Sequence, residues 1–554
     1  MVALESFLCL LPLLCVEGSP SVRLGRTVLT GREISSVQQE FFGNIPYAEP
    51  PVGNLRLRPP VSKLSLKTDS FDAREYGPAC LQVGTGLSPA EMSEDCLTIN
   101  VLRPAGTTAR DRLPVMFWTY GGGFQGGQAS TANASLIVAQ SVARGTPIIF
   151  INFNYRLGPL GFPQGHEAGA SGDVNLGIKD QIAALGWVQR NIGAFGGDKD
   201  KVALFGQSAG SVMMSILFLN PGVIEGLARG AIFESGFQGT APLFPPSRGE
   251  GDWQNFVAGV QSCSSSSSSS SSSNNSTSTL DCLRSNSTTA ASLLQGFTLA
   301  ASLTVNPDPF PPVLDGRAGL IPELPSVLFA QRRFAKMPFI AGTVLDEGTT
   351  FVPPTINSTE QLFASAIALF SPSDSPDVLE ESVKKLLELY PDESALGSPF
   401  NTGNETFGLS SQFKRASALV GDTDFQAQRR FWMHTAANAG VSTYGYLFTQ
   451  PQTTTPPAIG VFHASELLYV YGKPDDTSPS SEQLSWIMTD YWVSFVANLT
   501  PNDGLGVPKP EWRQFTSGDK VLMELNGENL TMIADDYRQE QIAFFNSNPA
   551  IWRR

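Results

Sequence analysis

Basic side chains are scarce in this chain and never form a run. The sequence has 37 Lys and Arg against 51 Asp and Glu, which gives a formal net charge of -14 and an isoelectric point near 4.8. Proteins bind nucleic acids by neutralising phosphates with clustered Lys and Arg. The charge balance therefore excludes a nucleic-acid partner.

Long apolar runs are lacking as well. Phe7–Val16 is an apolar stretch of ten residues, too short to span a bilayer, so we expect no stable membrane anchor. The small residues Gly18 and Ser19 follow it, an arrangement typical of a secretory signal. The sequence predicts a signal peptide over residues 1–18 and a secreted mature chain. Glu5 stands where such signals carry positive charge, and the alternative is a buried N-terminal helix.

Histidine is rare, with 3 in the whole chain. The three are scattered and no Cys/His cluster has ligand spacing, so we expect neither a metal nor a cofactor. The segment Gly121–Gly126 does match the dinucleotide pattern G-x-G-x-x-G. Dinucleotide binding by this pattern requires an acidic residue about 20 positions later to hold the ribose. No Asp or Glu occurs between Asp111 and Glu167, so the pattern does not indicate a dinucleotide site here.

The 6 cysteines and the glycosylation motifs are consistent with export. Removal of the signal leaves four cysteines, which allow three pairings. We favour the local pairing, Cys80–Cys96 and Cys263–Cys282, which closes two short loops. The candidates for N-glycosylation, each two positions before Ser or Thr, are Asn133, Asn274, Asn275, Asn286, Asn357, Asn404, Asn498 and Asn529.

A composition of 41% hydrophobic and 16% charged residues provides for a large core. No linker divides the chain, so we expect one domain over residues 19–554. Helical patterns such as Leu176–Ile192 separate most of the predicted strands. This alternation predicts an α/β fold with a mostly parallel sheet covered on both faces. The predicted strands are Pro114–Tyr120, Pro147–Asn154, Val202–Gly206, Ala231–Ser235, Pro338–Thr343 and Tyr444–Thr449.

Ser208 lies in Gly206-Gln207-Ser208-Ala209-Gly210, between an apolar strand and an apolar helix. This context predicts a nucleophile elbow, a tight turn that lifts a serine hydroxyl above the sheet edge. The sequence thus indicates acyl transfer. The N–H groups of Gly122, Gly123 and Ala209 are then the expected oxyanion hole, because such a site combines the residue after the nucleophile with a loop that follows an early strand.

A serine nucleophile needs a histidine base and an acid that orients it. The order along α/β-hydrolase chains is nucleophile, acid, histidine, which removes His166. His434 lies in a helical stretch, whereas His463 lies in a loop after the last predicted strand, so we predict His463 as the base. The acid is expected in the loop after the predicted strand Pro338–Thr343, where Asp346 and Glu347 are adjacent. Spacing does not distinguish between these two residues.

These motifs together resemble the type B carboxylesterase/lipase family, which includes fungal lipases, carboxylesterases and cholinesterases. The resemblance covers nearly the whole mature chain. It implies an α/β-hydrolase fold with large insertions and a Ser208-Glu347-His463 triad, with Asp346 as the alternative acid. It also supports the two local disulfides and the oxyanion glycines. The matching stretches are Glu94–Val101, Tyr120–Phe124, Asn154–Gly158, Phe195–Asp198 and Gly206–Gly210.

Two departures from the family bear on the substrate. Gln207 stands where many relatives carry glutamate, which removes a negative charge and makes cationic choline esters unfavourable. The loop between Cys80 and Cys96 is shorter than the disulfide-closed lid of the similar fungal lipases.

These departures favour an esterase of soluble or polysaccharide-linked esters, with feruloyl and other hydroxycinnamoyl esters of plant cell walls as candidates. The alternative is a triacylglycerol lipase or steryl esterase of the same family. A non-catalytic adhesion protein is a remote alternative, because the nucleophile, acid, base and oxyanion glycines are all present.

Overall fold

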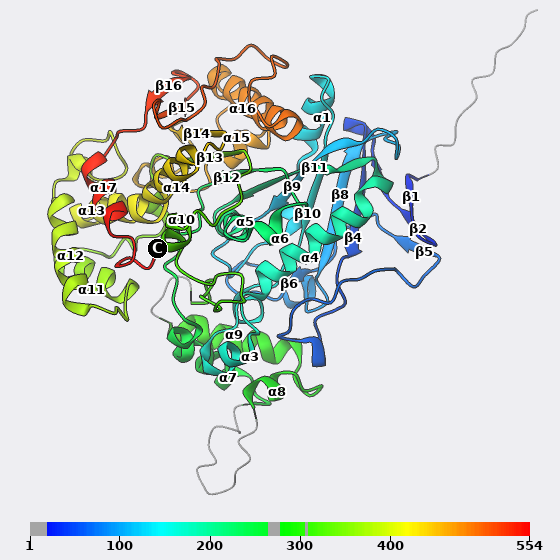
Figure 1. The fold of residues 1–554 in the computed structure, drawn as a ribbon, viewed down its shortest axis with the longest axis horizontal. Coiled ribbons are helices and arrows are strands. Elements are labelled where there is room, and N and C mark those ends of the chain that lie inside the picture. Colours follow the sequence, from blue (N-terminus) through cyan, green and yellow to red (C-terminus); the bar gives the residue numbers. More distant parts are fainter. Residues whose placement is uncertain (1–18, 264–277, 305–308) are drawn as a thin grey trace, which may run out of the picture.

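The computed structural model describes residues 19–263, 278–304 and 309–554. The predicted signal peptide at residues 1–18 and the candidate glycosylation sites Asn274 and Asn275 lie outside these residues. Within them, an 11-stranded sheet forms the centre of the molecule, in the order β16-β15-β14-β13-β12-β11-β9-β10-β8-β4-β3 (Figure 1). Its strands are β3 Arg32–Ile34, β4 Gln39–Pro46, β8 Thr98–Pro104, β9 Leu113–Thr119, β10 Ile149–Phe153, β11 Gly197–Gln207, β12 Gly230–Glu234, β13 Phe339–Val344, β14 Thr443–Phe448, β15 Val521–Leu525 and β16 Thr531–Ala534.

The six predicted strands are all present as β9 to β14. Together with β15 they pair in parallel, whereas β16 at one edge and β8, β4 and β3 at the other are antiparallel. The predicted α/β class with a mostly parallel sheet is therefore confirmed. Two small sheets are formed by β1 Ser21–Leu24, β2 Thr27–Thr30 and β5 Ser70–Asp72, and by β6 Ala79–Cys80 and β7 Met92–Ser93.

The antiparallel strands β4 and β8 were not predicted, because buried polar residues interrupt their apolar pattern. Asn100 of β8 donates a hydrogen bond to Asn152 Oδ1 at 2.9 Å. Arg103, also on β8, forms an ion pair of 2.6 Å with Glu40 of β4. Partners across the strands satisfy these groups, so polar residues occupy positions where a buried strand would normally show apolar ones.

Helices cover both faces of the sheet. On β11, Phe205 packs against Tyr471 on the side of α15 and α16, at 6.2 Å between ring centroids. The next residue, Gly206, faces Met214 of α5. Successive residues of a strand point to opposite faces, so α5 and the α15–α16 pair lie on opposite sides. The helices that pack on the sheet or its neighbours include α1 Ser135–Ala143, α4 Leu176–Asn191, α5 Ala209–Phe218, α14 Ala427–Asn438, α15 Leu467–Val470 and α16 Pro479–Asn498.

The chain between β13 and β14 forms a second hydrophobic cluster beside the sheet. Its helices α11 Thr359–Leu369, α12 Pro376–Leu389 and α13 Ser411–Gly421 pack with the C-terminal α17 Gln539–Ser547, at the left of Figure 1. The remaining helices of the described residues are α2 Gly158–Gly161, α3 Gly165–Ser171, α6 Pro221–Ile224, α7 Glu250–Gly259, α8 Thr279–Leu283, α9 Ala290–Leu303 and α10 Pro325–Ala330.

The two predicted disulfides are confirmed. Cys80 pairs with Cys96 and Cys263 with Cys282, with Cα–Cα distances of 5.1 and 5.8 Å. The six glycosylation candidates in the described residues, Asn133, Asn286, Asn357, Asn404, Asn498 and Asn529, are all exposed. Exposure is required of an acceptor asparagine, and occupancy of these sites stays a prediction.

Candidate active site

Ser208 forms a sharp turn between β11 and α5. Its backbone adopts φ 53° and ψ -132°, a region that costs free energy for a residue with a side chain. Glycine is required nearby, because a Cβ at Gly210 would lie 2.2 Å from the carbonyl oxygen of Thr119. The turn is held from β12, where Glu234 O accepts a hydrogen bond from Ser208 N at 2.9 Å. This geometry is that of a nucleophile elbow.

Glu347 and His463 lie in contact, 116 residues apart in the chain. His463 Nδ1 is 2.6 Å from Glu347 Oε2. The other carboxylate oxygen of Glu347 accepts hydrogen bonds from the Ser235 hydroxyl at 2.6 Å and from Val344 N at 2.9 Å. Because Glu347 is only 1% exposed, these contacts hold its carboxylate in one orientation. Ser235 was not predicted as a site residue, and its position at the end of the predicted strand Ala231–Ser235 was the only signal for it.

Asp346 faces away from His463. Its Oδ1 accepts hydrogen bonds from the Ser398 hydroxyl and from Phe400 N, each at 2.8 Å, and its Oδ2 accepts one from Val461 N at 2.9 Å. Burial raises the pKa of Asp346 even though these bonds favour its charged form. Of the two adjacent acids, the structure places Glu347 on the imidazole, and Asp346 joins the loops that carry both residues.

The imidazole of His463 faces Gln207 on its other side. Its Nε2 lies 3.1 Å from Gln207 Nε2, so the amide donates to a ring nitrogen that bears a lone pair. The remaining proton is then on Nδ1, which donates to Glu347. No hydrogen bond from the Ser208 hydroxyl is found among the described residues.

The glycine loop that contains the predicted oxyanion residues Gly122 and Gly123 approaches Ser208 at Gly121. A Cβ at Gly121 would be 2.8 Å from Ser208 Cβ, and one at Gly122 would be 2.2 Å from the carbonyl oxygen of Gly126. Gly122 and Gly123 adopt φ values of 107° and 60°. Within the described residues, the backbone N–H groups of Gly122, Gly123 and Ala209 donate to no other backbone group. They are therefore free to bind an oxygen of substrate.

The other two histidines lie elsewhere. His166 is exposed on α3. His434 is on α14, with its ring 5.4 Å from that of Phe515, and burial lowers its pKa to about 4. The described part of the chain contains no group of three or more His, Cys, Asp or Glu placed to hold a metal ion. None of its helices combines the length and apolar character needed to cross a membrane.

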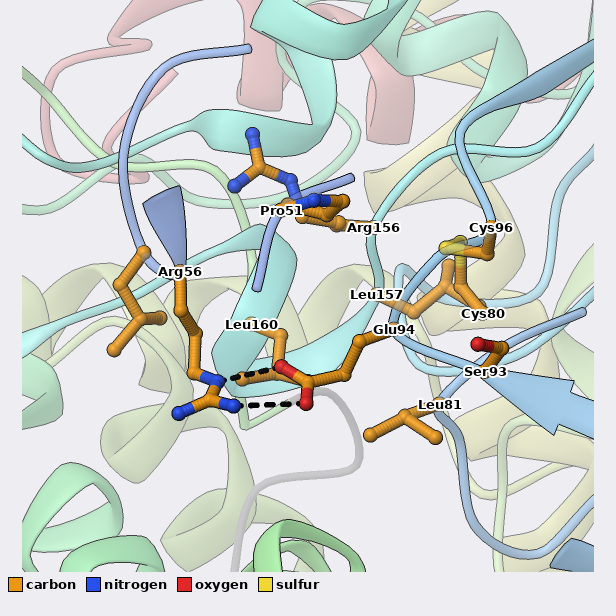
Figure 2. Close-up of a pocket in the computed structure, with 11 residues that line it drawn as sticks. Pro51, Arg56, Cys80, Leu81, Ser93, Glu94, Cys96, Arg156, Leu157 and Leu160 are labelled. Carbon is orange, nitrogen blue, oxygen red and sulfur yellow. Dashed lines mark hydrogen bonds and ion pairs between the residues drawn. A yellow bond between two sulfur atoms is a disulfide. The ribbon is translucent and has the colours of Figure 1, made fainter. Parts of the chain in front are cut away.

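The loop between Cys80 and Cys96 is anchored at both ends. Gln82 exchanges two hydrogen bonds with the backbone of Gly127, at 2.8 and 2.9 Å. At the other end Glu94 forms a bidentate ion pair with the buried Arg56, at 2.5 and 2.9 Å (Figure 2). Figure 2 also shows a small pocket lined by the disulfide, Leu157 and Leu160. This pocket lies under the loop and does not include Ser208.

The mostly parallel sheet, with a serine elbow after β11, an acid after β13 and a histidine after β14, defines an α/β-hydrolase. A model of the carboxylesterase family matches residues 19–545. The chain belongs to this family, type B, as its motifs indicated.

Fungal lipases are among its relatives. "Lipase 2" of Geotrichum candidum is 33% identical over 564 residues, covering 94% of this chain and 95% of the relative. "Secreted triacylglycerol lipase LIP1" of Gibberella zeae is 33% identical over 550 residues, covering 93% and 88%. The crystal structure of Aspergillus niger EstA superposes with a TM-score of 0.82 at 28% identity, covering 97% of this chain and 99% of that one. The expected α/β-hydrolase fold is thus confirmed.

Gln207 allows a prediction about pH. In a Gln207→Glu variant, a carboxylate beside His463 Nε2 favours the charged imidazolium, which cannot act as a base. We expect the acid limb of the kcat/KM profile to move up by about one pH unit. The matched variant Gln207→Met removes the same amide without adding charge and should leave the limb in place. Equal pH profiles for the Glu and Met variants would contradict the expectation.

Proposed function

We propose that the protein is a secreted serine carboxylic-ester hydrolase that uses Ser208, Glu347 and His463 as its triad. One observation carries the proposal: the buried Glu347–His463 pair at 2.6 Å, in the loops next to a serine on a strained elbow. The membership of the chain in the carboxylesterase family supports the same reaction.

The proposed mechanism is acyl transfer in two steps. His463 Nε2 takes the proton of Ser208 as the serine oxygen attacks the ester carbonyl carbon, and Glu347 stabilises the imidazolium that forms. His463 then gives that proton to the leaving alcohol. Water repeats the sequence on the acyl-enzyme, so the acid is released and Ser208 regains its proton.

The N–H groups of Gly122, Gly123 and Ala209 bind the negative oxygen of each tetrahedral intermediate. Donors of this kind contribute about 3 to 4 kcal/mol each to stabilisation of the transition state. No step requires a metal or a cofactor. The N–H groups are already oriented, so they need no reorganisation during the reaction.

For the substrate we propose soluble or aryl esters, including hydroxycinnamoyl esters of plant polysaccharides. Two features support this. The Cys80–Cys96 loop is short and anchored at both ends. Phe351 and Phe425 lie against His463, with ring centroids 5.0 and 4.8 Å from the imidazole, and Phe351 is 39% exposed. An exposed aromatic ring beside the base offers a stacking surface for an aromatic acyl group.

The relatives favour a second candidate, a triacylglycerol lipase, because the names of several of them describe lipases. The test is kcat/KM on methyl ferulate against an emulsified long-chain triglyceride, with Ser208→Ala as the blank. Preference for the ferulate supports the aryl esterase. Preference for the emulsion would contradict the aryl esterase and support the triacylglycerol lipase.

The anchored loop predicts the absence of interfacial activation. With tributyrin, we expect the rate to rise smoothly through the solubility limit of the substrate, because a loop fixed by Gln82 and Glu94 does not open on an oil surface. The measurement is initial rate against tributyrin concentration. A fungal lipase with a long lid is the control, which should show a jump when droplets form. A comparable jump for this protein would contradict the prediction.

We also propose that residues 1–18 are removed on secretion and that residues 19–554 form one catalytic domain. The relatives include proteins named as secreted. N-terminal sequencing of protein from the culture medium tests the cleavage. A change in gel mobility after enzymatic removal of N-glycans tests whether the exposed asparagines carry glycans. An intact N-terminus on the exported protein would contradict the predicted signal peptide.

A further inference from the structure

Two carboxyl groups are buried behind the Glu347–His463 pair, and the mechanism does not use them. Glu234 ends β12, and Glu466 lies in the turn that follows His463. Both residues are 0% exposed. Neither forms an ion pair with a cationic side chain of the described residues, and three of their four carboxyl oxygens have no hydrogen-bond partner there. The fourth, Glu234 Oε1, accepts a hydrogen bond of 2.8 Å from Trp492 Nε1.

Other buried polar atoms without partners adjoin this pair. The hydroxyls of Tyr446 and Tyr471 and the indole nitrogen of Trp118 make no hydrogen bond within the described residues. Tyr446 packs on Trp492 at 5.5 Å and Tyr471 on Trp118 at 5.6 Å between ring centroids. These residues come from β9 and β14, which flank β11, β12 and β13 in the central sheet, and from the α15–α16 region, where α16 contacts β9 and β11. The result is a polar cluster enclosed by aromatic rings.

The cluster offers no cation to hold a negative charge. The charged group that acts on Glu466 is Glu347, and the one that acts on Glu234 is Glu466. The neighbouring titratable groups Tyr446 and Tyr471 are themselves affected by Glu234, and neither can supply positive charge. His463 lies three residues before Glu466, and Glu347 already occupies its Nδ1. Burying a carboxylate without a cation or hydrogen bonds is so costly that the group keeps its proton instead.

We propose that Glu466 and Glu234 are positioning residues that remain neutral acids behind the triad, so that Glu347 supplies the only negative charge acting on His463. Through the acid limb of the kcat/KM profile, where His463 becomes the neutral base, both carboxyls are uncharged and add nothing that favours the imidazolium. The effect on activity rests on the proposed function, whereas the neutral state of the two carboxyls does not.

The electrostatics of the site support this assignment. Burial raises the pKa of Glu466 to about 8, and the charge of Glu347 adds to the effect. Burial, followed by the charge of Glu466, raises the pKa of Glu234 well above its ordinary range. Because the charge of Glu466 acts on Glu234, Glu466 loses its proton first and Glu234 stays neutral to a higher pH.

The sign of the stability effect follows from the raised pKa. An unfolded glutamate titrates near 4.3, so the folded protein holds the Glu466 proton where the unfolded chain has lost it. The stabilisation from Glu466 is therefore fully present below about pH 4.3 and is lost as the pH rises towards about 8. Glutamine at position 466 imitates the neutral acid at every pH and removes this dependence.

The experiment compares wild type, Glu466→Gln, Glu234→Gln and the control Glu511→Gln, which changes an exposed carboxyl. The melting temperature and kcat/KM are measured from about pH 5 to about pH 9. We expect the melting temperature of Glu466→Gln, relative to that of wild type, to increase by about 1 °C for each unit rise in pH. We also expect the acid limb of its kcat/KM profile to stay in place, because the amide replaces a carboxyl that is already neutral there. A downward shift of about one pH unit would mean that Glu466 is charged and would overturn the proposal. Glu511→Gln should follow wild type in both.

If the variants fail to fold, a second measurement on the wild type still tests the proposal. Infrared spectra of wild type with 13C-labelled glutamate carboxyls should show protonated, buried carboxylic acid at pH 7 that disappears at alkaline pH. Absence of that band, or melting temperatures of wild type and Glu466→Gln that fall in parallel, would overturn the proposal. These two readouts need no activity. Failure of the proposed function would appear separately, as ester hydrolysis that survives in Ser208→Ala.

Discussion

Replacing Ser208 by alanine is expected to lower kcat for ester hydrolysis by about a millionfold. Loss of the nucleophile or of its base in a serine hydrolase removes the covalent route as a whole, and residual catalysis comes from the oxyanion hole and substrate binding. The measurement is kcat and KM on a soluble aryl ester. Because alanine keeps the binding surface, we expect KM to change far less than kcat.

Ser215→Ala is the matched control for this prediction. Ser215 lies on the same helix, where its hydroxyl donates to Val212 O at 2.8 Å, and it is fully buried. Its loss tests the effect of removing a hydroxyl from α5 without touching the elbow. We expect activity within about threefold of wild type and a stability loss of about 1 kcal/mol. Labelling by a serine-reactive phosphonate should occur in wild type and in Ser215→Ala, and fail in Ser208→Ala.

Glu347→Gln is expected to lower kcat by about ten thousandfold. An amide in place of the acid of a triad keeps the shape of the site but stabilises the wrong histidine tautomer, and it no longer balances the charge of the imidazolium. His463 Nδ1 and Glu347 Oε2 are 2.6 Å apart, so the imidazole has no other acid at that nitrogen. The measurement is kcat on the same soluble ester from about pH 5 to about pH 9.

Asp346→Asn provides the comparison that separates the two adjacent acids. Asp346 accepts three hydrogen bonds from Ser398, Phe400 and Val461. Its amide variant should lose about 1 to 3 kcal/mol of stability and retain activity within about tenfold of wild type, because it does not touch the imidazole. If Asp346→Asn were inactive and Glu347→Gln active, the assignment of the acid would be wrong.

The elements that could be predicted are those set by local pattern. The six central strands appear as apolar runs because both of their faces are buried. The elbow at Ser208 could be recognised because its glycines, strand and helix are contiguous in the chain. The antiparallel strands β4 and β8 escaped prediction because their buried residues include Asn100 and Arg103, whose partners lie on other strands.

The fold class, the two local disulfides, the serine elbow and the glycine loop could be read from the sequence, because each depends on residues close together in the chain. Packing of the whole chain sets which of Asp346 and Glu347 meets His463, that Ser235 supports that carboxylate, and that Gln207 faces the imidazole. It alone brought Glu234 and Glu466 together. The physical reason is that contacts between residues more than 100 positions apart depend on how strands and loops pack, which local patterns do not specify.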